Sequence, residues 1–298
     1  MKYLHLNTLL LLSLSLLLQN CKSPSPLEVL EKEIKEELAQ VDGIFGVAFK
    51  NLSTGEEILI SARDSFHAAS TMKTPVMIEL YKQAAAGQFK LTDSIVIKNE
   101  FKSIVDGSPY SMSIDDDSEG KLYKAIGSKS TIADLAYDMI IYSSNLATNI
   151  LIELVDAKKV TQTMRELGAP DIQVLRGVED IKAYEQGLSN STTAFDLMAI
   201  YEKLALQEVV SAQASDEMID ILFDQKFNEI IPAHLPEGVK VAHKTGVITG
   251  VHHDSGIVFL PDGRKYVLVL LSRELGDFDT GTAKMADVSK IIYDYVVQ

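Results

Sequence analysis

The arrangement of apolar residues changes character twice along the chain, and this constrains the fold more than any other feature of the sequence. Near the N-terminus, residues 44–50 and 56–60 form apolar or alternating runs on either side of Asn-Leu-Ser-Thr-Gly. Such runs around turn-forming residues predict a β-hairpin. Near the C-terminus, residues 239–246, 255–260 and 265–271 show strand patterns, and Pro-Asp-Gly joins the last two. Strands therefore lie at both ends of the chain.

The segments between and outside these strands have a helical period. Residues 27–41 and 283–297 carry apolar residues at helical spacing, as do five inner segments: 70–86, 131–141, 146–154, 160–167 and 194–206. A further helix is expected over residues 216–223. We expect an α/β fold of the α+β kind, with an antiparallel sheet covered by the first and last helices and an inserted all-α domain. The sheet lobe is expected over about 27–65 and 210–298, and the helical lobe over about 66–209.

The length and net charge of the chain indicate a globular protein and argue against nucleic-acid binding. The chain has 298 residues, of which 46% are hydrophobic, so it can bury a large core. Its formal net charge is −14. An acidic surface of this size repels phosphate backbones, so we expect no nucleic-acid partner.

The first twenty residues have the pattern of a secretory signal peptide, because a Leu-rich run over residues 9–18 is too short to span a bilayer stably. Cys21 follows and is the only cysteine, which excludes an intramolecular disulfide and a cysteine-based zinc site. Its surroundings resemble a bacterial lipobox, although Asn20 stands where a small residue is usual. We expect a lipid-modified Cys21, a tether over residues 21–26 and an exported, periplasmic protein anchored to the membrane. Ordinary signal cleavage that leaves a free thiol is the alternative.

Ser70 and Lys73 are the first candidates for catalysis. They are three residues apart in a segment with helical character, so their side chains share a face. A serine hydroxyl needs a neighbouring base to become a good nucleophile, and a lysine with a lowered pKa is such a base. Alone, the pair also fits an N-cap serine followed by a solvated lysine.

Two further short motifs follow in order. Ser143 and Asn145 lie between two predicted helices, and Lys244-Thr245-Gly246 ends a predicted strand. The three motifs together resemble the serine β-lactamase and penicillin-binding protein superfamily, and class A β-lactamases most closely. The resemblance covers roughly residues 27–298, so this range is expected to be the catalytic domain.

The resemblance implies a role for each motif residue. Ser70 would be the nucleophile that becomes acylated, with Lys73 as its proton acceptor and Ser143 as the proton relay to the departing nitrogen. Substrate would be held by Asn145, Lys244, Thr245, Gly246 and Val247, and the backbone N–H groups of Ser70 and Val247 would form the oxyanion hole.

The chain also departs from the family pattern. Ser144 stands where the second motif usually has Asp, which predicts altered packing. The family's deacylating glutamate corresponds to Glu179 by its separation from Asn145, and Glu185 is the other candidate. The usual Asn four residues beyond is replaced by Ala183.

No arginine occurs from Gly250 to Gly256, where many β-lactamases have a cation for the substrate carboxylate. His252 and His253 stand there instead. Neighbouring residues on a strand point to opposite faces, so at most one of them can face the cleft.

An acidic segment, Asp115 to Gly120, has carboxylates at alternate positions like a calcium loop. The closing glutamate of such a loop would fall at Ile126, so the segment is interpreted as a solvated surface loop. We expect neither a metal nor another cofactor.

These observations favour a monomeric serine hydrolase that opens the ring of a small β-lactam substrate. The first alternative is a penicillin-binding DD-peptidase or other amide hydrolase with slow deacylation, whose substrate would be peptidoglycan-like. The second is a lipoprotein binding module that retains the motifs only as structure.

Overall fold

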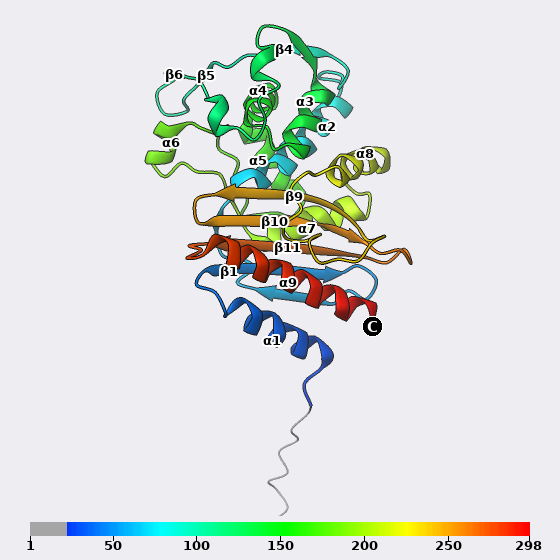
Figure 1. The fold of residues 1–298 in the computed structure, drawn as a ribbon. Helices are drawn as coiled ribbons and strands as arrows, with labels where there is room; N and C mark the ends of the chain where they lie inside the picture. The colour runs from blue at the N-terminus through cyan, green and yellow to red at the C-terminus, as the bar shows by residue number, and fades with distance from the viewer. Residues whose placement is uncertain (1–22) are drawn as a thin grey trace, which may run out of the picture.

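A computed structural model describes residues 23–298. Its centre is a five-stranded antiparallel sheet with the order β2-β1-β11-β10-β9 (Figure 1). The strands are β1 (Ile44–Asn51), β2 (Glu57–Ile60), β9 (Lys240–Ile248), β10 (Val251–Phe259) and β11 (Lys265–Arg273). Because β1 pairs with β11, strands from both ends of the chain meet in the middle of the sheet. The α+β fold expected from the sequence is confirmed.

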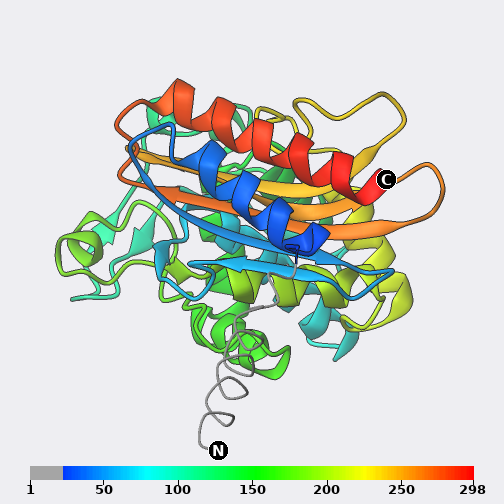
Figure 2. The same cartoon turned by 90° about the horizontal axis from the view of Figure 1, so that it is seen from below.

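Helices cover both faces of this sheet. Helix α1 (Pro26–Leu38) and helix α9 (Phe278–Val297) lie side by side on one face (Figure 2). Apolar residues of both helices, such as Ile34 and Ile292, pack with Phe49 and Leu268 of the sheet in one core cluster. Helix α7 (Ala194–Ala205) contacts β1, β10 and β11. It belongs to a second core cluster that continues into the helical part of the molecule.

The helical part consists of α2 (Lys73–Ala85), α3 (Ile132–Ile141), α4 (Asn145–Val155), α5 (Ala157–Glu166) and α8 (Ala212–Phe223). A single-turn helix, α6 (Ile181–Glu185), and short strand pairs fill the loops between them: β3 (Phe66–His67) with β8 (Ser191–Thr192), β4 (Ser94–Val96) with β7 (Lys129–Thr131), and β5 (Phe101–Lys102) with β6 (Pro109–Tyr110). The division into a sheet lobe and a helical lobe stays a prediction. Helix α7, within the range predicted for the helical lobe, lies against the sheet.

Several helices begin earlier than the apolar period predicts, because capping residues extend them. Asp277 accepts a hydrogen bond from the backbone N–H of Thr280, so α9 begins at Phe278 rather than Ala283. Ser211 caps α8 in the same way, and this helix begins at Ala212. Apolar spacing locates the buried face of a helix but not its first turn.

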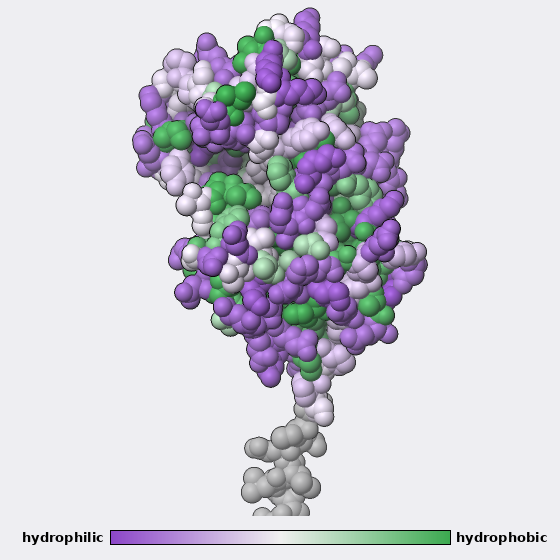
Figure 3. All heavy atoms as spheres, viewed as in Figure 1, coloured by the Kyte–Doolittle hydropathy of each residue, from purple (hydrophilic) through white to green (hydrophobic). Residues whose placement is uncertain are grey.

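The predicted signal peptide and Cys21 lie outside the described residues. Within residues 23–298, no helix is both long and apolar enough to cross a membrane. Figure 3 shows one face of this part of the chain, on which hydrophilic side chains cover most of the surface and hydrophobic ones form small separate groups.

Candidate active site

Ser70 lies on a 3₁₀ turn, η1 (Ala69–Met72), which leads directly into α2. The sequence predicts Ser70 and Lys73 on one continuous helix; the structure places Ser70 on the tighter turn and Lys73 at the first position of α2. Ala69 has a φ of 44°, a left-handed conformation that costs free energy in any residue with a Cβ. Backbone strain of this kind is concentrated at functional sites.

Lys73 is completely buried and joins Ser70's turn to the second motif. Its Nζ donates to the backbone carbonyl of Ser143 at 2.6 Å, to Ser143 Oγ at 3.1 Å and to Asn145 Oδ1 at 2.9 Å. Burial lowers the pKa of Lys73 to about 7, although the carboxylates of Asp117 and Glu179 oppose the shift. Within the described residues, the hydrogen bonds of Nζ go to the second motif and not to Ser70 Oγ.

Lys244, on strand β9, also contacts the hydroxyl of Ser143. Its Nζ donates to Ser143 Oγ at 3.1 Å and to the carbonyl of Thr245 at 3.0 Å. Burial, and then the neighbouring charge of Lys73, hold the pKa of Lys244 well below its usual value. Because both lysines donate to Ser143 Oγ, its lone pairs are occupied and its own hydrogen is free to be donated elsewhere.

The close packing of β9 against the turn at Ser70 explains why the third motif ends in glycine. Strand β9 lies directly against the turn that carries the candidate nucleophile, and a Cβ at position 246 would lie 3.0 Å from Ser70 N and 3.1 Å from Ala69 Cβ. The next residue, Val247, keeps an exposed side chain. The structure thus brings together the predicted residues of all three motifs: Ser70, Lys73, Ser143, Asn145, Lys244, Thr245, Gly246 and Val247.

Glu179 is half-buried in the loop before α6, with a φ of 60°. Burial raises the pKa of its carboxyl, and the carboxylates of Asp116 and Asp117 act in the same direction. The charge of the Glu179 carboxylate in turn raises the pKa of Lys73. Glu185 is exposed at the end of α6 and is not among the charges that shift Lys73. The structure therefore brings Glu179, rather than Glu185, close to Lys73.

Asn149, which sequence reasoning missed, holds this loop. Its Oδ1 accepts from the backbone N–H of Val178 at 2.6 Å, and its Nδ2 donates to the Val178 carbonyl at 2.9 Å. A Cβ on Gly177 would lie 2.3 Å from Asn149 Oδ1, so only glycine fits beside it. A second asparagine one turn after Asn145, next to apolar residues of the same predicted helix, was the available signal.

Arg176 anchors the base of the loop from the other side. Its Nε donates to the Leu188 carbonyl at 2.8 Å and its Nη1 to the Gly177 carbonyl at 2.9 Å. Across the part of the chain that the structure describes, Arg176 forms no ion pair with Glu179. The guanidinium of Arg176 binds backbone carbonyls of the loop, so the carboxylate of Glu179 is not neutralised by an ion pair with it.

The acidic segment is only partly a solvated loop, and the interpretation from its sequence is wrong for Asp117 and Glu119. Asp117 is half-buried and accepts hydrogen bonds from the backbone N–H groups of Asn145 and Leu146 and from the Tyr123 hydroxyl. Glu119 accepts from Ser144 Oγ at 3.3 Å. The loop docks on the N-terminus of α4, where unpaired N–H groups favour a carboxylate.

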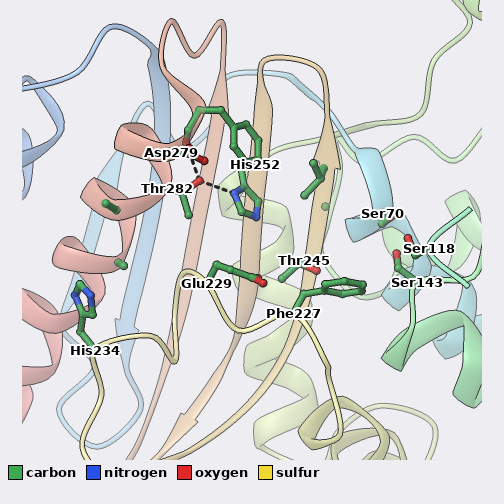
Figure 4. Close-up of a pocket in the computed structure, with 15 residues that line it drawn as sticks. Ser70, Ser118, Ser143, Phe227, Glu229, His234, Thr245, His252, Asp279 and Thr282 are labelled. Carbon is green, nitrogen blue, oxygen red and sulfur yellow. Dashed lines mark hydrogen bonds between the residues drawn. The ribbon is translucent and has the colours of Figure 1, made fainter. Parts of the chain in front are cut away.

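A cavity of 580 Å³ connects Ser70, Ser118 and Ser143 to the start of α9 (Figure 4). His252 lines the cavity, whereas His253 lies on the opposite side of β10, where its Nε2 is 2.9 Å from the His67 carbonyl. Only one of the two histidines faces the cleft, as the strand period predicts. Within residues 23–298, no group of three or more His, Cys, Asp or Glu side chains is arranged to hold a metal ion.

Comparison with known proteins identifies the family. The profile of the beta-lactamase enzyme family matches residues 29–296. The extended-spectrum β-lactamase PER-1 of Pseudomonas aeruginosa is 24% identical, with 97% of this chain and 93% of that protein covered. A β-lactamase of Citrobacter koseri is 26% identical over 80% of this chain and 79% of its own length.

Solved structures show the same fold. A β-lactamase from Sphaerobacter thermophilus is 26% identical, with a TM-score of 0.76 over 90% of this chain and 98% of that chain. A mutant of PBP-A, solved as an acyl-enzyme complex with penicillin G, is 25% identical, with a TM-score of 0.77 over 90% of this chain and 96% of that chain. The chain belongs to the beta-lactamase enzyme family, as a serine hydrolase of the class A type.

Proposed function

We propose that this protein hydrolyses β-lactams through an acyl-enzyme on Ser70. The observation that carries the proposal is the position of Ser143 Oγ, which accepts hydrogen bonds from both Lys73 and Lys244, 3.1 Å from each, in the same cavity as Ser70. A hydroxyl between two cations readily gives its own hydrogen to a departing nitrogen. This is the requirement for opening a cyclic amide.

Acylation begins when neutral Lys73 accepts the proton of Ser70 Oγ. The oxygen attacks the β-lactam carbonyl carbon, the C–N bond breaks, and the nitrogen takes the hydrogen of Ser143, which is replaced from the neighbouring lysines. The backbone N–H groups of Ser70 and Val247 stabilise the oxyanion. Asn145 holds the side-chain amide of the substrate, and Lys244, Thr245 and Gly246 hold its carboxylate end.

Deacylation adds water to the ester. Glu179 takes one proton from the water, the hydroxide attacks the ester carbon, and the bond to Ser70 Oγ breaks as the proton held by Glu179 passes to that oxygen, which restores both the serine hydroxyl and the carboxylate. The raised pKa of Glu179 suits a general base that works near neutral pH. The presence of this acid, together with family membership, favours hydrolysis over the slow, penicillin-binding alternative and over a binding module.

Time-resolved mass spectrometry of the purified mature domain with excess penicillin tests the proposal. We expect an adduct on Ser70 that forms and then disappears as hydrolysed product accumulates. A stable adduct would show a penicillin-binding protein without deacylation. The absence of any adduct, with Ser70→Ala as the reference, would reject β-lactams as substrates.

We also propose that the protein is exported and anchored through Cys21, and that it acts as a monomer. The signal-like first twenty residues and the lipobox-like sequence support the anchor. The mainly hydrophilic face in Figure 3 supports the monomer. Expression in a β-lactam-sensitive bacterium, with fractionation of wild type and Cys21→Ala, tests both resistance and anchoring. A wild-type protein found only in the soluble fraction would reject the anchor.

A further inference from the structure

The end of the cleft farthest from Ser70 is built around His252. This side chain is only 4% exposed, and its ring stacks on Phe278 with the centroids 4.9 Å apart and the planes at 9°. Its Nδ1 lies 2.7 Å from Thr282 Oγ1. Both partners belong to the first turns of α9, so the helix fixes the orientation of the imidazole.

The hydrogen bonds of Thr282 identify which ring nitrogen carries the proton. Thr282 Oγ1 donates its only hydrogen to the carbonyl of Phe278, at 2.8 Å. It must therefore accept a hydrogen bond from His252, which places the proton on Nδ1. In the neutral imidazole, Nε2 then carries a lone pair and acts only as an acceptor. Burial lowers the pKa of His252, which favours the neutral ring.

Nε2 faces the cavity without a hydrogen-bond partner among residues 23–298 (Figure 4). Two carboxylates, Glu229 and Asp279, line the same end of the cavity, and Glu229 is close enough to act on the pKa of His252. No lysine or arginine is among the described residues that line the cavity. Of the titratable side chains at this end, two are carboxylates, His252 presents an acceptor, and His234 is paired with Asp287, 3.2 Å from its Nδ1.

Such a surface selects against an anion. A carboxylate placed here would meet two like charges and the lone pair of Nε2, whereas an ammonium or amidinium group would be attracted by all three. A buried acceptor that finds no donor in the bound ligand also loses free energy. We propose that this end of the cleft is a subsite for a cationic, hydrogen-bond-donating substituent of the substrate, with His252 Nε2 and Glu229 as its recognition groups.

This inference rests on the proposed function, because it concerns the part of a β-lactam that extends past Lys244 and Thr245. It names the substrate class of the same site: β-lactams with a positively charged donor group next to the ring carboxylate. Three cephalosporins that differ only at C3 provide the probe, with aminomethyl, hydroxymethyl or carboxymethyl groups. The acylation efficiency, measured as kcat/KM, is compared at pH 7.5 and low ionic strength.

We expect the aminomethyl compound to be preferred over the carboxymethyl compound by about tenfold or more, with the hydroxymethyl compound between them. The preference should decrease as salt is added, because the two carboxylates are exposed and therefore screened. Glu229→Gln should reduce the ratio about threefold, and the Glu229→Gln, Asp279→Asn double variant should reduce it further.

Glu237→Gln is the matched control, since Glu237 is an exposed acid near the same loop that does not line the cavity. It should leave the ratio unchanged. Equal efficiencies for the three compounds, a preference for the carboxymethyl compound, or an equal effect of the control variant would overturn the subsite while the hydrolytic function stands. Failure of all three compounds to acylate Ser70 would instead reject the proposed function, and the subsite with it.

Discussion

Both carboxylate oxygens of Asp117 accept a hydrogen bond from the backbone N–H of Asn145, at 2.9 and 3.0 Å. One of them also accepts from the N–H of Leu146 at 3.0 Å. The N-terminus of α4 is thus stabilised by an acid 28 positions earlier in the chain. Ser144 occupies the motif position where the resemblance leads one to expect Asp. The carboxylate missing there is supplied by a separate loop.

Asp117→Ala is expected to lower the free energy of unfolding by about 1–3 kcal/mol, because it removes a charged cap from α4. Acylation should slow by about tenfold, since Asn145 loses its fixed position. Thermal denaturation and the rate of adduct formation measure the two effects. Asp115→Ala is the control on the same loop, because the Asp115 side chain is exposed. An equal effect of both variants would show that Asp117 has no special role.

Glu179→Gln is expected to trap the acyl-enzyme. The amide cannot take a proton from water, so deacylation should fall by about 100-fold or more while acylation continues. Mass spectrometry should find Ser70 modified throughout the reaction. Glu185→Gln, on the exposed end of the next helix, should turn over like wild type. Normal turnover of Glu179→Gln would reject it as the base.

Acylation is expected to rise with pH around a midpoint of about 7. Lys73 must be neutral to accept the proton of Ser70, and burial lowers its pKa to about 7. Single-turnover acylation rates from pH 5 to 9 measure this midpoint. In Asp117→Asn the midpoint should move to lower pH, because a charge that favours protonated Lys73 is removed. Glu179→Gln should move the midpoint in the same direction, because its charge also favours protonated Lys73. Disappearance of the titration in Glu179→Gln, rather than a shift of its midpoint, would assign it to the glutamate.

The same lowered pKa predicts how stability depends on pH. Between about 7 and 10.5, Lys73 binds a proton in the unfolded chain but not in the folded protein. Unfolding then takes up a proton, so the contribution of Lys73 to the free energy of unfolding becomes more favourable as pH rises through this window. The wild type should gain stability relative to Lys73→Met over this range, by an amount on the order of a few kcal/mol. Lys158→Met, at an exposed position, is the control variant, and an equal trend in both comparisons would reject Lys73 as its source.

Asn149→Ala is expected to slow deacylation more than acylation. The substitution removes both hydrogen bonds to Val178, which precedes Glu179, but leaves the two buried lysines in place. Burst kinetics with a chromogenic cephalosporin separate the two steps. Glu153→Ala, on the exposed side of the same helix, is the control. A uniform loss of both steps would indicate a general defect of α4 rather than a loosened loop.

Much of this architecture could be predicted from local sequence. Period and turn residues identify the strands of the sheet, and the three motifs identify the residues that meet at its edge. Asp117 and Asn149 could not be assigned a role in this way, because each acts across the fold on a backbone group whose position depends on tertiary packing. The pattern around Asp117 fits a solvated acidic loop equally well until α4 is placed beside it.

The histidines show a similar limit. The strand period predicts that His252 and His253 face opposite sides, and the structure agrees. It does not predict the tautomer of His252, which follows from the hydrogen bonds of Thr282 at a position 30 residues later. The sequence therefore suggests which residue stands at the position of the usual cation. Whether its ring donates or accepts a hydrogen bond in the cleft depends on helix α9.

The pairing of Lys73 and Lys244 around one hydroxyl also affects the folded state as a whole. Each of the two buried lysines disfavours the charged form of the other in the free protein, and a bound anion would favour the charged form of both. The protein should therefore be more resistant to heat with a carboxylate inhibitor than without one. Selection for thermal stability alone would favour variants that lack one of the two lysines, and such variants would no longer acylate Ser70.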